Sequence, residues 1–264
     1  MAPTRRAPDN VKFTEPLYTM TEASRYLGVA PRTFWEWVHG QDPSEPLISG
    51  ATGQAVACLF PSDGQTFFAI SYDPNRDSFY GLGSDGNVPA IFRVNRQTGI
   101  VALMCTLDGG IYRSLTYNAK TGLFYSVRVS PGDEQFTALV AIDPQTGQAS
   151  QLVDLGRAAA FNSTFSVACN PHGVVYLAYA GLLHGFNPYT GEMLSSVYSQ
   201  AHPVYSMSFE PASGELYVTA VDWLYRPYFA AIDPGSGQTL RTIGAATSGW
   251  FGMSFGPGPA QLHP

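Results

Sequence analysis

Few side chains in this sequence have the types and spacing that catalysis or metal binding requires. The five histidines and three cysteines lie far apart, and none shows the spacing of a metal site. Neither a Gly-x-Ser-x-Gly motif nor a phosphate-binding glycine loop is present. Asp133 and Glu134 are adjacent carboxylates that suit acid–base chemistry or cation binding, although a solvated turn explains them better. We therefore expect no catalytic residue, metal or cofactor, and an enzyme is the less favoured interpretation.

One loop combines aromatic and charged side chains in a way that suits a ligand or a partner. Residues 222–228 read Asp-Trp-Leu-Tyr-Arg-Pro-Tyr, and His202 and Trp250 lie in other segments that break the repeats described below. Stacking and cation–π contacts are the chemistry that such loops offer, while packing against neighbouring structure is the alternative. The candidate ligand or partner residues are Asp222, Trp223, Tyr225, Arg226, His202 and Trp250.

Composition favours many short strands joined by tight turns. The chain has 264 residues, of which 45% are hydrophobic and only 13% charged, and it holds 27 glycines and 20 prolines. This profile excludes a coiled coil, a helical bundle and a disordered chain. The net charge of −6, with lysine only at Lys12 and Lys120, disfavours a broadly cationic surface for nucleic acid or membranes.

The cellular compartment is predicted from what the sequence lacks. No apolar run approaches the roughly 18 residues of a membrane span, and the basic N-terminus is not followed by the apolar segment of a secretory signal. Cys58, Cys105 and Cys169 each lie in an apolar strand-like context, which favours buried, reduced thiols. We expect a cytoplasmic protein that does not interact with membranes.

Three markers repeat in one register after residue 50. A turn that ends in glycine recurs at Gly53, Gly99, Gly147, Gly191 and Gly237, spaced by 46, 48, 44 and 46 residues. A strand that ends at a turn recurs as Ile70–Pro74, Leu115–Asn118, Val167–Pro171, Met207–Pro211 and Met253–Pro257. A strand tyrosine recurs at Tyr80, Tyr125, Tyr176 and Tyr217. Repeats of this length with about four short strands are typical of a β-propeller.

Within each repeat the expected order is an innermost strand, the tyrosine strand, a third strand that ends before a glycine turn, and an outer strand. Four repeats are complete. The region starts with an outer strand, 53–60, and ends with an inner strand, 251–255, so the two chain ends would share a partial fifth blade that lacks its two middle strands. Asp143 and Asp233 precede proline in the glycine turn, where an aspartate accepts a hydrogen bond from the backbone two residues on.

The last repeat also carries a recognisable motif. Residues 216–219 read Leu-Tyr-Val-Thr, 231–234 read Ala-Ile-Asp-Pro, 240–244 read Leu-Arg-Thr-Ile-Gly, and 252–255 read Gly-Met-Ser-Phe. This pattern resembles the YVTN-type propeller repeats. The resemblance implies strands and turns and does not imply an activity.

A different period, typical of helices, occupies residues 14–40. Thr19 and Glu22 fit a capping box, and Gly28 fits a helix C-terminus. Pro31 fits the first turn of a second helix, which ends at Gly40. The segment therefore predicts a short helix-turn-helix unit.

Residues 16–34, from Pro-Leu-Tyr-Thr-Met-Thr-Glu-Ala to Arg-Thr-Phe, and the later Pro-Leu-Ile-Ser at 46–49 resemble the MerR-type helix-turn-helix of excisionases and of a bacterial antitoxin family. The resemblance implies that residues 19–40 bind DNA, with the second helix in the major groove. The candidate DNA-binding residues that it implies are Arg25, Arg32, Thr33 and Trp35.

These observations predict a mainly β fold in three parts: a tail over 1–13, a small α-helical helix-turn-helix over 14–49, and a β-propeller over 50–264 with four full blades and a partial fifth. The predicted function is a non-enzymatic binding protein with a DNA-binding-like head and a propeller that binds a protein partner or ligand. One alternative is an assembly component or scaffold that docks or oligomerises through propeller edges. A metal-dependent hydrolase or lactonase is the other.

Overall fold

A computed structural model describes residues 46–48, 55–58, 67–73, 75–95, 100–130, 136–157, 164–201, 203–211, 213–221 and 226–245. The chain divides into two units, residues 1–44 and 45–264, and all the described residues belong to the second. The predicted helix-turn-helix over 14–49 therefore lies outside the described residues, apart from Pro46–Ile48.

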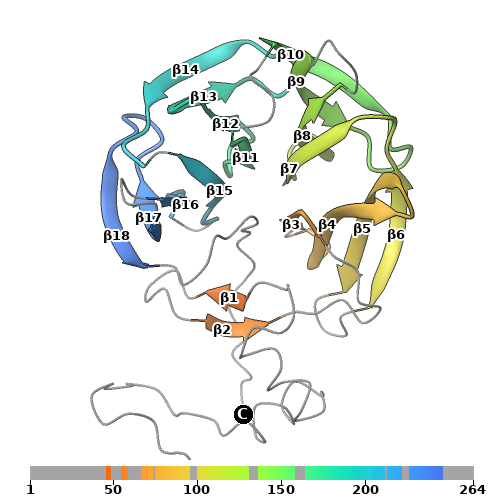
Figure 1. Cartoon of the computed structure of the whole chain (residues 1–264), viewed down its shortest axis with the longest axis horizontal. Coiled ribbons are helices and arrows are strands. Elements are labelled where there is room, and N and C mark those ends of the chain that lie inside the picture. The colour runs from red at the N-terminus through yellow and green to blue at the C-terminus, as the bar shows by residue number, and fades with distance from the viewer. Residues whose placement is uncertain are drawn as a thin grey trace, which may run out of the picture. The chain divides into compact units, whose positions relative to one another are not determined.

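The described residues form a β-propeller with four blades, which confirms the predicted repeat architecture (Figure 1). Each blade is an antiparallel sheet of four strands paired in chain order. Blade I contains β3 (Ala69–Asp73), β4 (Ser78–Asp85), β5 (Val88–Asn95) and β6 (Val101–Thr106). Blade II contains β7 (Ile111–Asn118), β8 (Leu123–Val129), β9 (Phe136–Ile142) and β10 (Ala149–Arg157).

Blade III contains β11 (Ser166–Cys169), β12 (Val175–Tyr179), β13 (Leu182–Phe186) and β14 (Met193–Tyr198). Blade IV contains β15 (Val204–Phe209), β16 (Leu216–Val221), β17 (Pro227–Ile232) and β18 (Thr239–Ala245). The first strand of each blade lies toward the centre of the ring and the fourth on its rim (Figure 1). The predicted order of strands within each repeat is thus confirmed, and the tyrosine strand is the second in every blade.

The hydrophobic core lies between successive blades. Strand side chains alternate between the two faces of a sheet, and both faces of a middle blade pack on neighbours, so the strands read as mostly apolar runs. Between blades I and II the buried side chains include Tyr80, Leu82 and Phe124. Separate clusters join blades II and III and blades III and IV. Among the described blades, II and III are therefore packed on both faces, and I and IV each share one such cluster with a neighbour.

Turn glycines fix how closely the blades approach. Gly147 has a φ of 73°, and a Cβ placed on it would lie 2.0 Å from the Thr106 carbonyl oxygen at the end of β6 in the preceding blade. Gly191 and Gly237 occupy the same turn in blades III and IV, and a Cβ on either would meet a carbonyl oxygen of β10 or β14 at 2.4 Å and 2.0 Å respectively. The repeated turn therefore needs glycine for its backbone conformation and for contact with the previous blade.

A fifth sheet, with only two strands, precedes blade I. β1 (Pro46–Ile48) pairs antiparallel with β2 (Ala55–Cys58). The sequence predicted an outer strand over 53–60, and β2 lies within it, but β1 was not predicted. Pro46–Ile48 belongs to the Pro-Leu-Ile-Ser segment that resembles the antitoxin family. It thus pairs with β2, which the sequence analysis assigns to the propeller repeats.

The described part of the chain contains strands and turns and no α-helix, and accordingly no helix in it is long and apolar enough to cross a membrane.

Candidate functional site

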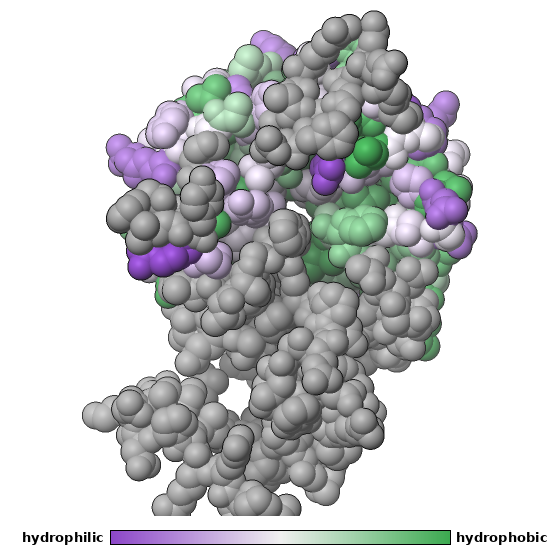
Figure 2. Space-filling model, viewed as in Figure 1, coloured by the Kyte–Doolittle hydropathy of each residue, from purple (hydrophilic) through white to green (hydrophobic). Residues whose placement is uncertain are grey.

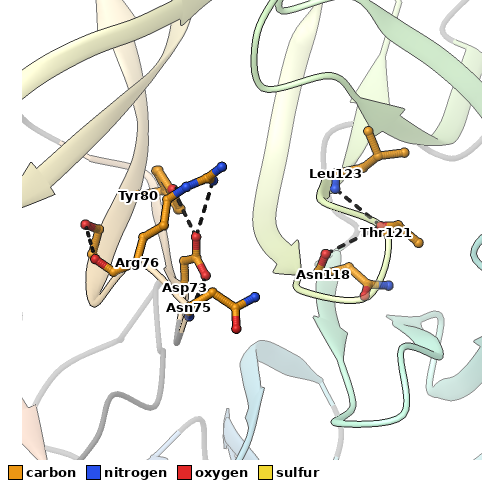
Figure 3. Close-up of polar contacts among 8 residues, drawn as sticks. Asp73, Asn75, Arg76, Tyr80, Asn118, Thr121 and Leu123 are labelled. Atoms are coloured by element: carbon orange, nitrogen blue, oxygen red, sulfur yellow. Dashed lines mark hydrogen bonds and ion pairs between the residues drawn. The ribbon is translucent and has the colours of Figure 1, made fainter.

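The most distinctive polar cluster lies where the fourfold pattern is broken, at the turn between β3 and β4. Asp73 is fully buried, and its carboxylate accepts hydrogen bonds from the Tyr80 hydroxyl at 3.2 Å and from the Asn75 amide at 2.9 Å. The Arg76 guanidinium lies 3.5 Å from the same carboxylate and 3.4 Å from the Tyr80 hydroxyl. We call Asp73, Arg76 and Tyr80 the polar corner (Figure 3).

The corresponding turn of blade II makes different contacts. Asn118 stands at the position of Asp73, and its side-chain amide donates to the Gly173 carbonyl of blade III at 2.8 Å. Tyr125 corresponds to Tyr80 and donates to the Pro188 carbonyl of blade III at 3.2 Å. A carboxylate has no proton to donate at neutral pH, so Asp73 cannot make the bond that Asn118 makes to the next blade. Blade I instead directs its aspartate and tyrosine toward each other.

Burial and charge set the protonation of the corner. Burial raises the pKa of Tyr80, and the hydrogen bond to Tyr80 raises the pKa of Arg76. Burial also raises the pKa of Tyr117, whose ring centroid lies 5.5 Å from that of Tyr80 with the two rings tilted. The corner therefore presents a half-exposed guanidinium beside neutral phenols and above a buried carboxylate. Such a set can donate hydrogen bonds to a polar or anionic group.

Sequence reasoning missed this corner. Asp73 and Tyr80 were recognised only as repeat markers, and Arg76 was not singled out. The available signal was that the first repeat has Asp at the strand end where the next two have Asn118 and Asn170, with an arginine three residues later. Only the fold shows that these side chains meet.

Most of the predicted site residues lie outside the described residues. Among the ligand or partner candidates only Arg226 is described, and it is exposed just before β17. The remaining candidates outside the described residues are Asp222, Trp223, Tyr225, His202 and Trp250, together with the DNA-binding candidates Arg25, Arg32, Thr33 and Trp35. Their roles stay predictions.

The structural role predicted for the aspartates of the glycine turn is confirmed. Asp143 accepts a hydrogen bond from the Gln145 amide at 2.7 Å, and Asp233 accepts one from the Gly235 amide at 3.0 Å. Asn187 does the same with the Tyr189 amide in blade III. These side chains hold the turn that brings the glycine against the preceding blade.

Two of the three cysteines have side chains that the structure describes. Cys105 and Cys169 are free, and burial raises the pKa of both, to about 12 for Cys169. No group of three or more histidine, cysteine or acidic side chains within the described ranges is placed to hold a metal ion.

Buried tyrosines predict a defined response to alkaline pH. Burial raises the pKa of Tyr125 to about 12, from an ordinary value near 10. A raised pKa means that the folded state favours the protonated phenol, so this contribution is complete below pH 10 and is lost as the pH rises toward 12. We expect Tyr125→Phe to flatten the fall in unfolding free energy between pH 10 and 12, measured by urea denaturation. Tyr198→Phe, which alters a tyrosine that is 65% exposed and is not among the groups that shift the pKa of Tyr125, is the control and should leave the slope unchanged.

Comparison with known proteins supports the fold alone. No family model and no curated protein matches the chain. A chain of the nidogen/laminin complex is similar over 71% of this chain and 66% of its own length, with a TM-score of 0.51 and 13% identity. TolB from Acinetobacter baumannii has a TM-score of 0.48 and 10% identity, over 71% of this chain and 45% of its own. The chain thus spans less than two thirds of the length of either structure, and the likeness to the first shows a β-propeller.

Proposed function

We propose that this protein is a non-catalytic assembly component whose propeller docks through the outer strand of blade III. The observation that carries the proposal is the exposure of apolar side chains on and beside β14. Tyr189 is 73% exposed, Met193 55%, Leu194 52% and Tyr198 65%. Green hydrophobic residues also reach the rim of the ring on the face drawn in Figure 2. Exposed apolar clusters rimmed by polar residues mark interaction sites in soluble proteins.

Charge distinguishes β14 from two of the other rim strands. β10 carries Asp154 and Arg157, and β18 carries Arg241, which pairs with Glu215 at 2.7 Å. Inward or edge charges of this kind discourage strand pairing, whereas Met193–Tyr198 contains none. An antiparallel second copy of β14 would place Met193 opposite Tyr198 without opposing charges. We therefore take the partner to be a second copy of this chain.

Sedimentation of the full chain at increasing concentration tests this function. We expect dimers to form in the micromolar range, and Leu194→Lys to weaken the dimer at least tenfold, because a lysine in the edge strand would need to be desolvated opposite the apolar Val197 of the second copy. Leu103→Lys, on β6 and 49% exposed, is the matched control and should leave dimerisation intact. A wild-type chain that stays monomeric at all concentrations would contradict the proposal.

We also propose that both chain ends complete the ring with a partial fifth blade. The β1–β2 pair has the antiparallel arrangement of the third and fourth strands of the other blades, such as β5 and β6. In the view of Figure 1 the pair falls between blade IV and blade I, with β1 nearer the centre. In such a blade β1 would be the third strand and β2 the fourth. The blade would then lack only its second strand, whereas the sequence alone indicated that both middle strands were missing.

The predicted DNA-binding head is a second proposal and rests on the family resemblance of residues 16–34. If this head binds DNA, the protein should bind duplex DNA at low salt and dissociate as the salt concentration rises, because contacts with phosphates release counterions. Arg32→Ala is expected to weaken binding by about tenfold, as one lost phosphate or base contact does. Fluorescence anisotropy with a labelled duplex measures it, with Arg93→Ala on the exposed part of β5 as the control.

A further inference from the structure

Three buried polar atoms within the described ranges have no hydrogen-bond partner: Arg128 Nε, Thr137 Oγ1 and His184 Nδ1. The rest of the Arg128 guanidinium is satisfied, because it lies 3.1 Å from the Asp108 carboxylate and donates to the Gly109 carbonyl at 2.9 Å. The Thr137 hydroxyl does not ionise. His184 is therefore the one of the three whose charge can change near neutral pH, and an unsatisfied buried atom of this kind calls for an explanation.

His184 lies on β13, on the face of blade III that packs against blade II. Side chains alternate between the two faces of a strand, so His184 shares its face with Phe186, which belongs to the apolar cluster between these blades. The two ring centroids are 6.0 Å apart. The residue opposite His184 on β12 is Leu177, which belongs to the same cluster. The buried nitrogen therefore lies in an apolar interface.

On its other side, His184 pairs with the proposed docking strand. In the antiparallel register of β13 and β14 it lies opposite Ser196, in the middle of Met193–Tyr198. β14 is the outermost strand of blade III, and within that sheet β13 is its one neighbour. A change at His184 thus acts directly on the strand that we propose as the dimer interface.

Protonation would place a buried hydrogen-bond donor in the interface between blades II and III. The neutral imidazole carries one proton, and it avoids a buried donor when that proton is on Nε2 and Nδ1 is left as an acceptor. The imidazolium carries a proton on both nitrogens. Its Nδ1 proton would be buried, charged and without an acceptor, which is costly in an apolar environment. Burial accordingly lowers the pKa of His184 from its ordinary value of 6.5.

The titratable groups around His184 do not offset this cost. On the elements of this interface they are Tyr125 of β8, Cys169 of β11, Tyr179 of β12 and Tyr198 of β14, with Asp154 and Arg157 on β10. The phenols and the thiol are neutral at and below neutral pH. Asp154 is exposed, and its carboxylate accepts a hydrogen bond from the Gly156 amide at 2.8 Å. Burial is accordingly the cause of the lowered pKa of His184.

We infer that His184 is a pH sensor that controls dimerisation through β14. With the ring neutral, β14 stays on β13 and presents its outer edge to a second copy. With the ring protonated, exposure of Nδ1 to water becomes favourable, and β14 can move because it has one neighbour in its sheet. The inference rests on the proposed dimer and names its regulation, which is dissociation in acid.

The direction of this effect separates it from that of overall charge. The chain has a formal net charge of −6 at pH 7, so two copies repel each other. Lowering the pH removes negative charge, and the loss of repulsion alone would strengthen the dimer. His184 predicts the opposite result, because the dimer should weaken as the pH falls below 6.5, the ordinary pKa of a histidine.

Sedimentation of the full chain at about pH 7.5 and about pH 5.5 tests the sensor. The dissociation constant of the wild-type dimer is expected to rise at least about fivefold in acid, the lower end of the usual coupling between two sites. His184→Leu, which places an apolar side chain in an apolar interface, should abolish this rise. His172→Gln removes a histidine from an exposed turn of the same blade and is the matched control, which should respond as the wild type does.

Linkage provides a second measurement that needs no variant. Since protonation weakens the dimer, dimerisation must lower the pKa of His184 by the matching amount. NMR titration of the His184 ring should therefore give a lower pKa in a concentrated, dimeric sample than in a dilute, monomeric one.

The outcomes distinguish the sensor from the dimer itself. A dimer whose dissociation constant does not rise in acid, or rises equally in His184→Leu, would overturn the sensor and leave the dimer standing. The same pKa for His184 in monomer and dimer would do so as well. A chain that is monomeric at about pH 7.5 at every concentration would contradict the proposed function and the sensor together.

Discussion

Replacing Gly147 with alanine is expected to lower the free energy of unfolding by about 2 to 5 kcal/mol. Part of this loss, about 1 to 2 kcal/mol, is the cost of a side chain at positive φ. The rest comes from the new Cβ, which would lie 2.0 Å from the Thr106 carbonyl oxygen. Backbone cannot move aside as a flexible side chain can, so blades I and II must separate locally, at about 1 to 3 kcal/mol for overpacking of this kind.

Gly122→Ala is the control for this change. Gly122 also has a φ of 73°, but no atom lies within 4 Å of a Cβ placed there. Its replacement should therefore cost only the conformational part, about 1 to 2 kcal/mol. Urea denaturation of both variants measures the difference. Equal losses of unfolding free energy would mean that the contact with the preceding blade adds nothing to the cost of replacing Gly147.

Phe124→Ala is expected to destabilise the propeller by about 3 to 5 kcal/mol, the usual cost of removing a large aromatic side chain from a core. Phe124 is completely buried between blades I and II, and its ring meets that of Tyr80 edge-on at 4.8 Å. The cavity would also remove support from Tyr80, whose hydroxyl binds Asp73. We therefore expect the polar corner to loosen as well, seen as faster exchange of the Asn75 amide.

Phe136→Ala serves as the matched control, because Phe136 begins β9 in the same blade and is 43% exposed. Its removal should cost less than about 1 kcal/mol, since exposed apolar surface contributes little to folding. A loss for Phe124→Ala as small as that for Phe136→Ala would mean that the interface between blades I and II is not a major source of stability.

The repeat architecture could be predicted from the sequence because its markers are local. A glycine turn, a strand that ends in an acidic or amide residue, and a strand tyrosine follow one another within about 45 residues, and each reflects a backbone or packing need that recurs along the repeats. β1 was not predicted, although the glycine turn at Gly53 follows it as the same marker follows the third strand of the other repeats. Its three residues are too few to show a strand period, and they lie in a segment that resembles another family.

The polar corner could not be predicted, for a different reason. Asp73 and Tyr80 lie seven residues apart on adjacent strands, in the register where Tyr80 faces Ser71. The Tyr80 hydroxyl binds Asp73 in its own blade, whereas the Tyr125 hydroxyl binds the Pro188 carbonyl of the next blade. Which contact forms depends on the acceptor that the next blade offers. Such a choice between two tertiary contacts leaves no periodic trace in the chain.

The glycine contact has a consequence for how the number of blades is set. The glycine turns of blades II, III and IV each pack against the rim strand of the preceding blade, so the same contact recurs between each pair of neighbouring blades. A duplicated copy of blade II, inserted after the original, would meet the same surfaces on both sides. The added blade would make the same glycine contact with its predecessor and offer the same rim strand to its successor, which is how this architecture can gain a member by duplication of one repeat.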